Sequence, residues 1–303
     1  MTEKYTFGLC LTHDVDRVVK KYQYIYKLIK NLDFSQLWDL ASEINPYWQF
    51  ERIMEIEERL GVRSSFNVLD EIHLSDRPKS EWMTMTGWEL YAGRYDVSNP
   101  QIKAVLNILN THGWEIALQG SFTSSQNPER FEYEKDRIET AADTEIIGNR
   151  QHYWNLSRPE TWRHLQDCGI KYDTSLGSPT SIEFKEGYEL IRPFNDEFVV
   201  FPWSLMDEAI MNSAKDFDEA WSNIKSLLNK VQNRRSVLVA DWHQRVFYED
   251  EFPGWSRMYC RLIKKAKEMD AWIGTPQRFY EATSHPAGTI EQTLDTLSNS
   301  TNF

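Results

Sequence analysis

Apolar residues recur along the chain with two alternating spacings, one typical of strands and one typical of helices. Short apolar segments with strand character are separated by longer stretches in which apolar residues lie three and four positions apart. This alternation over nearly the whole length favours a parallel α/β fold over separate all-α and all-β blocks. The predicted strands are 5–14, 64–69, 114–119, 146–153, 199–205, 237–242 and 271–274.

The predicted helices have recognisable start signals. Asn-Pro pairs at 99–100 and 127–128 each put an N-cap residue before a proline at the first helical position. The apolar spacing over 217–231 and 255–266 predicts two further amphipathic helices. Seven strands alternating with helices suit a barrel.

The length of 303 residues fits a single α/β domain. We predict one domain over residues 1–284, with insertions near 18–50 and 70–100 that interrupt the strand and helix rhythm. Residues 285–303 are rich in Thr, Ser and Asn with little periodicity, so the sequence predicts a poorly ordered tail.

Composition excludes several classes of protein. The chain has 34 Lys and Arg against 46 Asp and Glu, a net charge of -12 that opposes nucleic-acid binding, and it has no basic stripe. No apolar run is long enough to span a membrane, and the first residues lack a secretory signal pattern. Three widely spaced cysteines fit a reducing compartment. We therefore expect a cytoplasmic protein, and the sequence leaves its oligomeric state open.

Polar residues follow the apolar core of several predicted strands, which is where α/β barrels carry their reactive groups. Asp14 and Asp16 follow the first strand and lie two positions apart, so in an extended chain both point to the same side. One could bind a metal while the other takes a proton. The alternative is structural, because an Asp after a strand often caps a turn or the next helix.

Further strand ends carry His, Arg and amide groups. His243 follows the buried-looking run 237–240, and an imidazole there could serve as a general acid near neutral pH. A lone His is more often a hydrogen-bonded structural residue, and this alternative stays open for each one. The other candidates at these strand ends are Gln119, Ser121, Arg150, His152, Tyr153 and Trp242.

Four motifs, taken in order, resemble the polysaccharide deacetylase superfamily, which is carbohydrate esterase family 4 of the NodB-homology type. They are Asp14-Val15-Asp16, HGWEIALQGSF at 112–122, GNRQHY at 148–153 and WHQ at 242–244. The resemblance extends from about residue 5 to residue 282. It implies an irregular (β/α)7 barrel, which agrees with the number of predicted strands.

The resemblance also implies metal-assisted removal of an N-acetyl group from an amino sugar or glycan precursor. By position, Asp14 matches the base that activates water, Arg150 the residue that positions this base, and His243 the acid that protonates the departing amine. Asp16 matches the carboxylate ligand of a divalent metal, most simply zinc, and His152 is a second candidate ligand. We predict substrate contacts from Gln119, Ser121, Tyr153 and Trp242.

The sequence departs from the family pattern at two of the positions that usually supply metal ligands. Members usually supply His-x-x-x-His after the third strand, and this chain has Gln119 and Thr123 at those positions. Zinc prefers imidazole or thiolate, so the expected site is weakened unless His13, His152 or His243 rebuilds it. Three possibilities stay open: a remodelled metal enzyme, a barrel with altered chemistry, and a catalytically inactive carbohydrate-binding relative that has lost the metal site.

Overall fold

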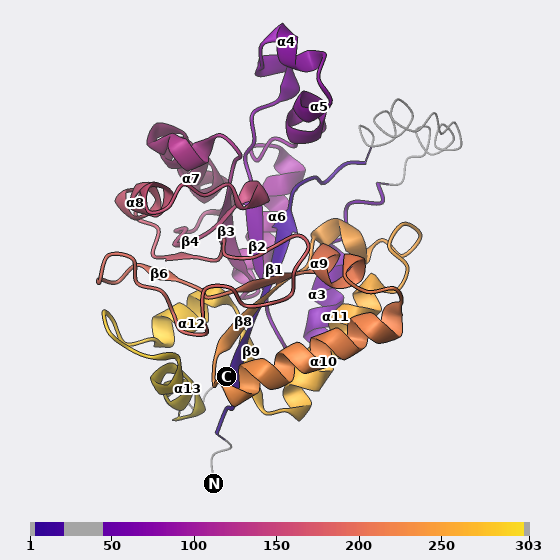
Figure 1. Cartoon of the computed structure of the whole chain (residues 1–303). Coiled ribbons are helices and arrows are strands. Elements are labelled where there is room, and N and C mark those ends of the chain that lie inside the picture. The colour runs from indigo at the N-terminus through magenta and orange to yellow at the C-terminus, as the bar shows by residue number, and fades with distance from the viewer. Residues whose placement is uncertain (1–3, 21–44, 300–303) are drawn as a thin grey trace.

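A curled parallel sheet with helices packed on its outside forms the core of the protein (Figure 1). This computed structural model describes residues 4–20 and 45–299. The strands are β1 (Phe7–Val15), β2 (Ser65–Leu69), β3 (Glu115–Gly120), β4 (Gly148–Gln151), β5 (Tyr172–Asp173), β6 (Val199–Val200), β7 (Ser204–Met206), β8 (Val237–Asp241) and β9 (Ala271–Gly274). They follow the order β6-β5-β4-β3-β2-β1-β8-β7, and β9 pairs with β1.

Strand β1 is the centre of this sheet. Its lower part pairs with both β8 and β9, and its upper part, from Thr12 to Val15, pairs with β2. All nine residues of β1 are buried. Phe7, Leu9 and Leu11 pack in the cluster under the outer helices, whereas Cys10 points into a smaller cluster on the other face. Both faces are covered, as expected for a parallel sheet.

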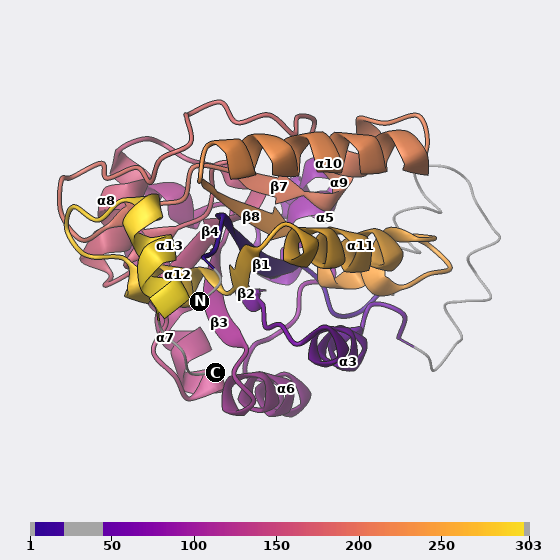
Figure 2. The same cartoon turned by 90° about the horizontal axis from the view of Figure 1, so that it is seen from below.

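The outer helices surround the strands when the molecule is seen from below (Figure 2). Asn99 and Asn127 cap α6 and α7 as predicted, each accepting a hydrogen bond from a backbone N–H in the first turn. Within the described residues, no helix has both the length and the apolar character needed to span a membrane. The longer helices are α3 (Phe50–Leu60), α6 (Pro100–Thr111), α7 (Pro128–Ala142), α8 (Glu160–Asp167), α10 (Phe217–Asn233) and α11 (Trp255–Glu268).

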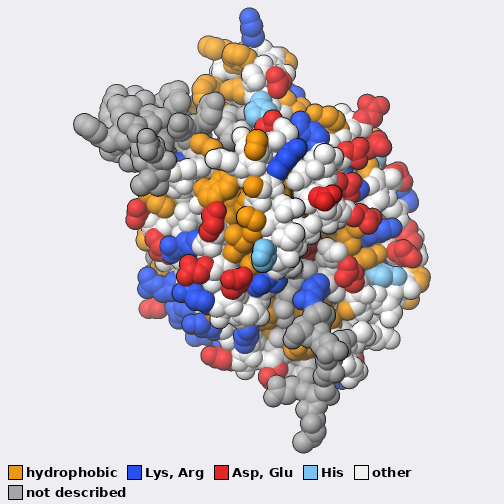
Figure 3. All heavy atoms as spheres, turned by 180° about the vertical axis from the view of Figure 1, so that it is seen from behind, with side chains coloured by type: hydrophobic (Ala, Val, Ile, Leu, Met, Phe, Trp, Pro, Cys, Tyr) orange, Lys and Arg blue, Asp and Glu red, His pale blue; other side chains and the backbone are white. Residues whose placement is uncertain are grey.

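The insertion predicted near 70–100 forms a projection beyond the upper ends of the strands (Figure 1). It contains a short helix η2 (Leu74–Asp76), α4 (Lys79–Trp82) and α5 (Met85–Tyr91). Hydrophobic side chains gather at its tip (Figure 3), where Trp82, Met83 and Met85 are exposed. Most of the other predicted insertion, near 18–50, lies outside the described residues.

Two strand predictions need correction. The segment 199–205 forms two short strands, β6 and β7, separated by Phe201, Pro202 and Trp203. A proline has no N–H to donate to a sheet, which explains the break. Strand β5 was not predicted, because its two residues are too few for a periodic pattern.

The prediction of a poorly ordered tail is wrong for the residues that the structure describes. Residues 290–299 form α13 (Ile290–Asn299), in which Ile290 and Leu294 are buried one helical turn apart. The Ser298 hydroxyl also accepts a hydrogen bond from the Tyr5 backbone N–H at 2.9 Å. This apolar repeat is short and lies among Thr and Ser residues, so the polar composition of the segment outweighed its helical periodicity in the prediction. Nearby, α12 (Pro276–Ala282) packs under β1.

A buried carboxyl group lies at the lower end of the sheet, where β3 begins. Glu115 is 7% exposed and accepts hydrogen bonds from the Tyr172 hydroxyl and, at 3.0 Å, from the Gln277 backbone N–H. Burial raises the pKa of Glu115 to about 7, although its hydrogen bonds partly offset that effect. The folded state therefore binds this proton more tightly than the unfolded chain does.

We predict that Glu115→Gln makes the protein more stable at pH 8 than the parent. A pKa raised from 4.5 to about 7 means that the parent loses stability as pH rises through this interval and loses no more above it. The loss is roughly 3 kcal/mol at about 1.4 kcal/mol per pKa unit. Urea unfolding of both proteins at pH 4.5 and pH 8 measures it.

The exposed Glu268→Gln variant is the matched control, and it should show no comparable gain in stability over the parent at pH 8. A Glu115→Gln variant whose stability difference from the parent is the same at both pH values would contradict the prediction.

Candidate active site

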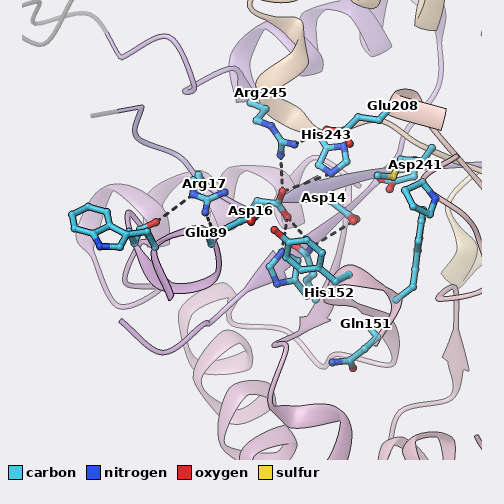
Figure 4. Close-up of a pocket in the computed structure, with 17 residues that line it drawn as sticks. Asp14, Asp16, Arg17, Glu89, Gln151, His152, Glu208, Asp241, His243 and Arg245 are labelled. Carbon is cyan, nitrogen blue, oxygen red and sulfur yellow. Dashed lines mark hydrogen bonds and ion pairs between the residues drawn. The ribbon is translucent and has the colours of Figure 1, made fainter. Parts of the chain in front are cut away.

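A cavity of about 360 Å³ lies at the upper ends of the strands, under the projection that carries α5 (Figure 4). This volume is within the usual range for small-ligand sites. Its lining combines acidic, basic and aromatic side chains from distant parts of the chain. Six of the predicted site residues line it: Asp14, Asp16, Gln119, His152, Tyr153 and His243. The geometry thus brings most of the candidate set together.

Asp14 is held by three donors at the end of β1. Its Oδ1 accepts a hydrogen bond from Asn67 Nδ2 at 2.7 Å and lies 3.5 Å from Arg150 Nη1. Its Oδ2 accepts from Gln119 Nε2 at 3.3 Å. The same Arg150 nitrogen lies 2.8 Å from Asp241 Oδ2, so one buried guanidinium joins two carboxylates.

Asp16 is surrounded by positive and N–H-bearing groups. Its Oδ2 accepts a hydrogen bond from Arg245 Nη1 at 2.6 Å, and its Oδ1 accepts from Gln119 Nε2 at 2.9 Å. His152 Nε2 and His243 Nε2 lie 3.5 Å and 3.6 Å from the same carboxylate (Figure 4). Burial alone would raise the pKa of Asp16, but Arg245 and the two imidazoles hold it well below its usual range.

His243 is fixed by Asp207, the first residue of α9 (Asp207–Asn212). Its Nδ1 lies 3.0 Å from Asp207 Oδ1, and its backbone N–H donates to Asp207 Oδ2 at 2.8 Å. Burial opposes a charged imidazole, but the charge of Asp207 outweighs it and raises the pKa of His243 to about 10. The Nε2 atom then carries a proton and is free to face the cavity and Asp16.

The chain after β4 brings His152 and two aromatic rings into the cavity. His152 begins the short helix η4 (His152–Trp154), and its Nδ1 lies 3.8 Å from Glu71 Oε2. Burial lowers the pKa of His152, which favours the neutral imidazole. Tyr153 and Trp154 both have positive φ, 57° and 48°, a strained backbone in side chains of this size. This turn aims both rings at the cavity lining.

Two predicted substrate contacts do not line the cavity, and the first is Ser121. Its backbone N–H donates to Glu134 Oε2 at 3.0 Å, and the side chain is fully buried. The chain turns away from the cavity after Gly120, into the short helix η3 (Ser124–Gln126). Thr123 lies on the same turn, 3.4 Å from the Ser121 hydroxyl, and is also absent from the cavity lining.

The second is Trp242, which lies on the helix side of the sheet with His13. The Trp242 indole N–H donates to the Trp255 carbonyl at 3.3 Å. His13 bridges the Trp242 carbonyl oxygen, 2.7 Å from Nδ1, and Glu57 Oε1, 2.9 Å from Nε2. Successive strand residues point to opposite faces, so the neighbours of Asp14 and His243 cannot join them. His13 therefore has the structural role and cannot rebuild a metal site.

Sequence reasoning missed several charged residues of the site, among them Asp241, Arg245 and Asp207. Asp241 and Arg245 lie two positions before and two after His243, and both line the cavity with it. The alternation of the extended chain could have identified Asp241. No sequence pattern could have identified Asp207, because only the pairing of β7 with β8 brings it next to His243.

The metal prediction can be tested against the chemistry of the donors. In the described residues, Asp14, Asp241 and His243 offer ligand atoms within 4.8 Å of one another. However, Arg150 already lies between these two carboxylates. At the predicted position, both oxygens of Asp16 already accept N–H groups, from Gln119 and from Arg245. These residues do not fit zinc, which needs several unprotonated donors and no competing cation.

Solved structures with this architecture are known, although no protein-family model and no curated protein matches the sequence. A Mycobacterium smegmatis protein described as a polysaccharide deacetylase has TM-score 0.61 and 14% identity, covering 93% of this chain and 91% of that one. A Pseudomonas aeruginosa protein described in the same way has TM-score 0.58 and 11% identity, covering 91% and 90%.

An allantoinase, PuuE, has TM-score 0.59 and 12% identity, covering 93% of this chain and 91% of its own. At these identities the likeness is one of fold. It confirms the predicted architecture over almost the whole chain: the protein has the irregular (β/α)7 barrel fold of the polysaccharide deacetylase superfamily.

Proposed function

We propose that this protein is a hydrolase that removes an N-acetyl group from an amino sugar or glycan precursor. The observation that carries the proposal is the pairing of Asp14 with His243. Each is held by its own network, and their side-chain atoms lie within 4.8 Å of each other in one cavity. A base and an acid so placed are what amide hydrolysis needs, because the amine leaves poorly as an anion.

Asp14 is the proposed base. Asn67, Gln119 and Arg150 direct N–H groups at its oxygens, so the carboxylate is held in one orientation toward the cavity. It would take a proton from a water molecule as that water attacks the acetyl carbon. The C–O bond forms in this step, and the acetyl oxygen gains negative charge.

His243 is the proposed acid. The Asp207 carboxylate fixes its Nδ1, which leaves Nε2 on the cavity side. In the second step the C–N bond would break, and the proton on Nε2 would pass to the departing amine. The products are acetate and the free amino sugar, and both side chains regain their starting protonation from solvent. No step requires a metal ion at Asp16.

An aromatic wall supports a sugar as the substrate. Trp88, Tyr153 and Trp154 also line the cavity, and sugar rings pack well on aromatic faces. Two of the structural neighbours described above act, by their names, on polysaccharides. All three cysteines are unpaired, as is common in a reducing compartment, so we propose a cytoplasmic glycan precursor.

The direct test is release of acetate from a panel of N-acetylated amino sugars and nucleotide-linked precursors, with allantoin included because of the third neighbour. Turnover of an N-acetyl sugar supports the proposal, and turnover of allantoin alone would contradict the substrate class. Saturable binding of a sugar without turnover of any compound would favour the catalytically inactive relative.

We predict that Asp14→Asn lowers kcat for acetate release by about 10²- to 10⁴-fold. Asn is nearly isosteric and keeps a hydrogen-bonding side chain, but it cannot take a proton from water. The melting temperature should stay within a few degrees of the parent. Asp218→Asn, at an exposed position in α10, is the control and should keep full activity. Near-normal turnover by Asp14→Asn would remove this residue from the mechanism.

We predict that Asp207→Asn lowers kcat by about 10²-fold or more while changing KM only a few-fold. An amide in place of the carboxylate no longer favours the imidazolium or its orientation, but it leaves the cavity lining intact. Steady-state kinetics on the best substrate separates the two parameters. A rise in KM as large as the fall in kcat would instead indicate that the loop around His243 has moved.

A further inference from the structure

We infer that Arg245 supplies the positive charge that stabilises the oxyanion of the reaction, in the electrostatic role that the family resemblance assigns to a metal. The inference rests on the proposed function, because it names a further catalytic group in the same cavity. It comes from the disagreement between the predicted zinc site and the donors that the chain presents there.

Arg245 is a built-in cation and is held from two sides. Its Nη1 donates to Asp16 Oδ2 at 2.6 Å, and its Nη2 lies 3.3 Å from Glu208 Oε1. The side chain is 16% exposed and lines the cavity, so the guanidinium is largely out of bulk water but still within reach of a ligand. A guanidinium has five N–H donors, and these two contacts use two of them.

The position of Arg245 relative to the proposed base and acid is suitable. Arg245 belongs to η5 (Gln244–Phe247), which starts directly after His243, and both side chains reach the same carboxylate of Asp16 (Figure 4). Gln119 links Asp16 to Asp14 through its amide group. Arg245 and His243 therefore both lie next to Asp16, and Asp14 is linked to Asp16 through Gln119. All of them line the same cavity.

Asp16 then has a positioning role rather than the role of a metal ligand. A carboxylate binds a guanidinium or a divalent cation through the same two oxygens, and here each oxygen already accepts one N–H, from Arg245 or from Gln119. A fixed cation near a developing oxyanion in a site with little water lowers the barrier, because it needs no reorganisation during the reaction. Arg245 also stays charged throughout the accessible pH range.

The chemistry balances without any further reactant. Water attacks the acetyl carbon, its proton passes to Asp14, and the electron pair of the C=O bond moves to oxygen, where the Arg245 N–H groups would face it. Collapse of this intermediate restores C=O, breaks the C–N bond and sends the His243 proton to nitrogen. Arg245 changes neither charge nor bonding during the cycle.

The first experiment measures kinetics on the best substrate. We expect Arg245→Met to lower kcat by about 10²- to 10³-fold with only a few-fold change in KM, since the charge on oxygen exists mainly in the transition state. Arg245→Lys should recover part of this loss, which also guards against a Met variant that fails to fold. Arg257→Met, at an exposed position in α11, is the control. Unchanged kcat in Arg245→Met would overturn the inference.

The second experiment needs no turnover, so it separates this inference from the proposed function. Methylphosphonate is a tetrahedral anion with the shape of the intermediate, and calorimetry should show that it binds the parent at least 10-fold more tightly than Arg245→Met. If the parent releases no acetate from any substrate, the proposed function fails while this comparison still tests the cation. Equal affinity of the two proteins for methylphosphonate would overturn the inference.

Zinc binding provides the third measurement. The parent should show no stoichiometric zinc binding in a calorimetric titration, and prolonged chelation should leave acetate release unchanged. The double variant Gln119→His, Arg245→Met frees Asp16 and adds an imidazole beside it, so it should gain measurable zinc affinity. Tight zinc binding by the parent, or loss of its activity on chelation, would overturn the inference.

Discussion

The buried carboxylate of Asp16 is the constraint on which the site depends. A charge removed from water must be paired, because leaving it alone costs several kcal/mol. Here the pairing comes from the chain itself: Arg245 and Gln119 bind its two oxygens, and His152 and His243 lie within 3.6 Å. The groups that neutralise Asp16 are the same ones that line the cavity, so pairing the charge also arranges the site.

This arrangement accounts for the two residues that differ from the family pattern. Of the two positions where imidazoles are expected, Gln119 in β3 turns its amide N–H groups toward Asp14 and Asp16, and Thr123 is outside the cavity. A second cation close to Asp16 would be repelled by Arg245. The amide of Gln119 and the guanidinium of Arg245 are therefore compatible with each other, and both support our proposal of a site with a fixed cation.

The proposed site combines a rigid strand with the segments that follow the strands: Asp14 belongs to β1, whereas His243 and Arg245 lie after the end of β8. All nine residues of β1, which carries Asp14, are buried. Asp207 immediately follows β7, which pairs with β8, and His243 lies two residues after the end of β8. Side chains on packed strands lose little further freedom when a substrate binds, which suits a preorganised site. The aromatic wall is different, because Tyr153 and Trp154 come from a strained turn after β4, and Trp88 comes from the projecting insertion.

Local pattern was sufficient for most of the fold and for half of the site. Strand and helix periodicities, the Asn-Pro caps and the ordered motifs predicted the barrel, because these signals act over a few neighbouring residues. They also made Asp14, Arg150 and His243 candidate site residues, since Asp14 and His243 lie near the ends of recognisable strands and Arg150 lies within another.

Only the tertiary structure decided which charges meet. Arg245 reaches Asp16 across 229 positions of sequence, and Asp207 reaches His243 across 36, so neither contact leaves a local trace. Ser121 and Trp242 were assigned to the cavity from their place near strand ends, but the backbone turn after Gly120 and the alternation of β8 direct them elsewhere. A sequence determines which residues approach a strand end, whereas packing determines which way each side chain faces and what neutralises its charge.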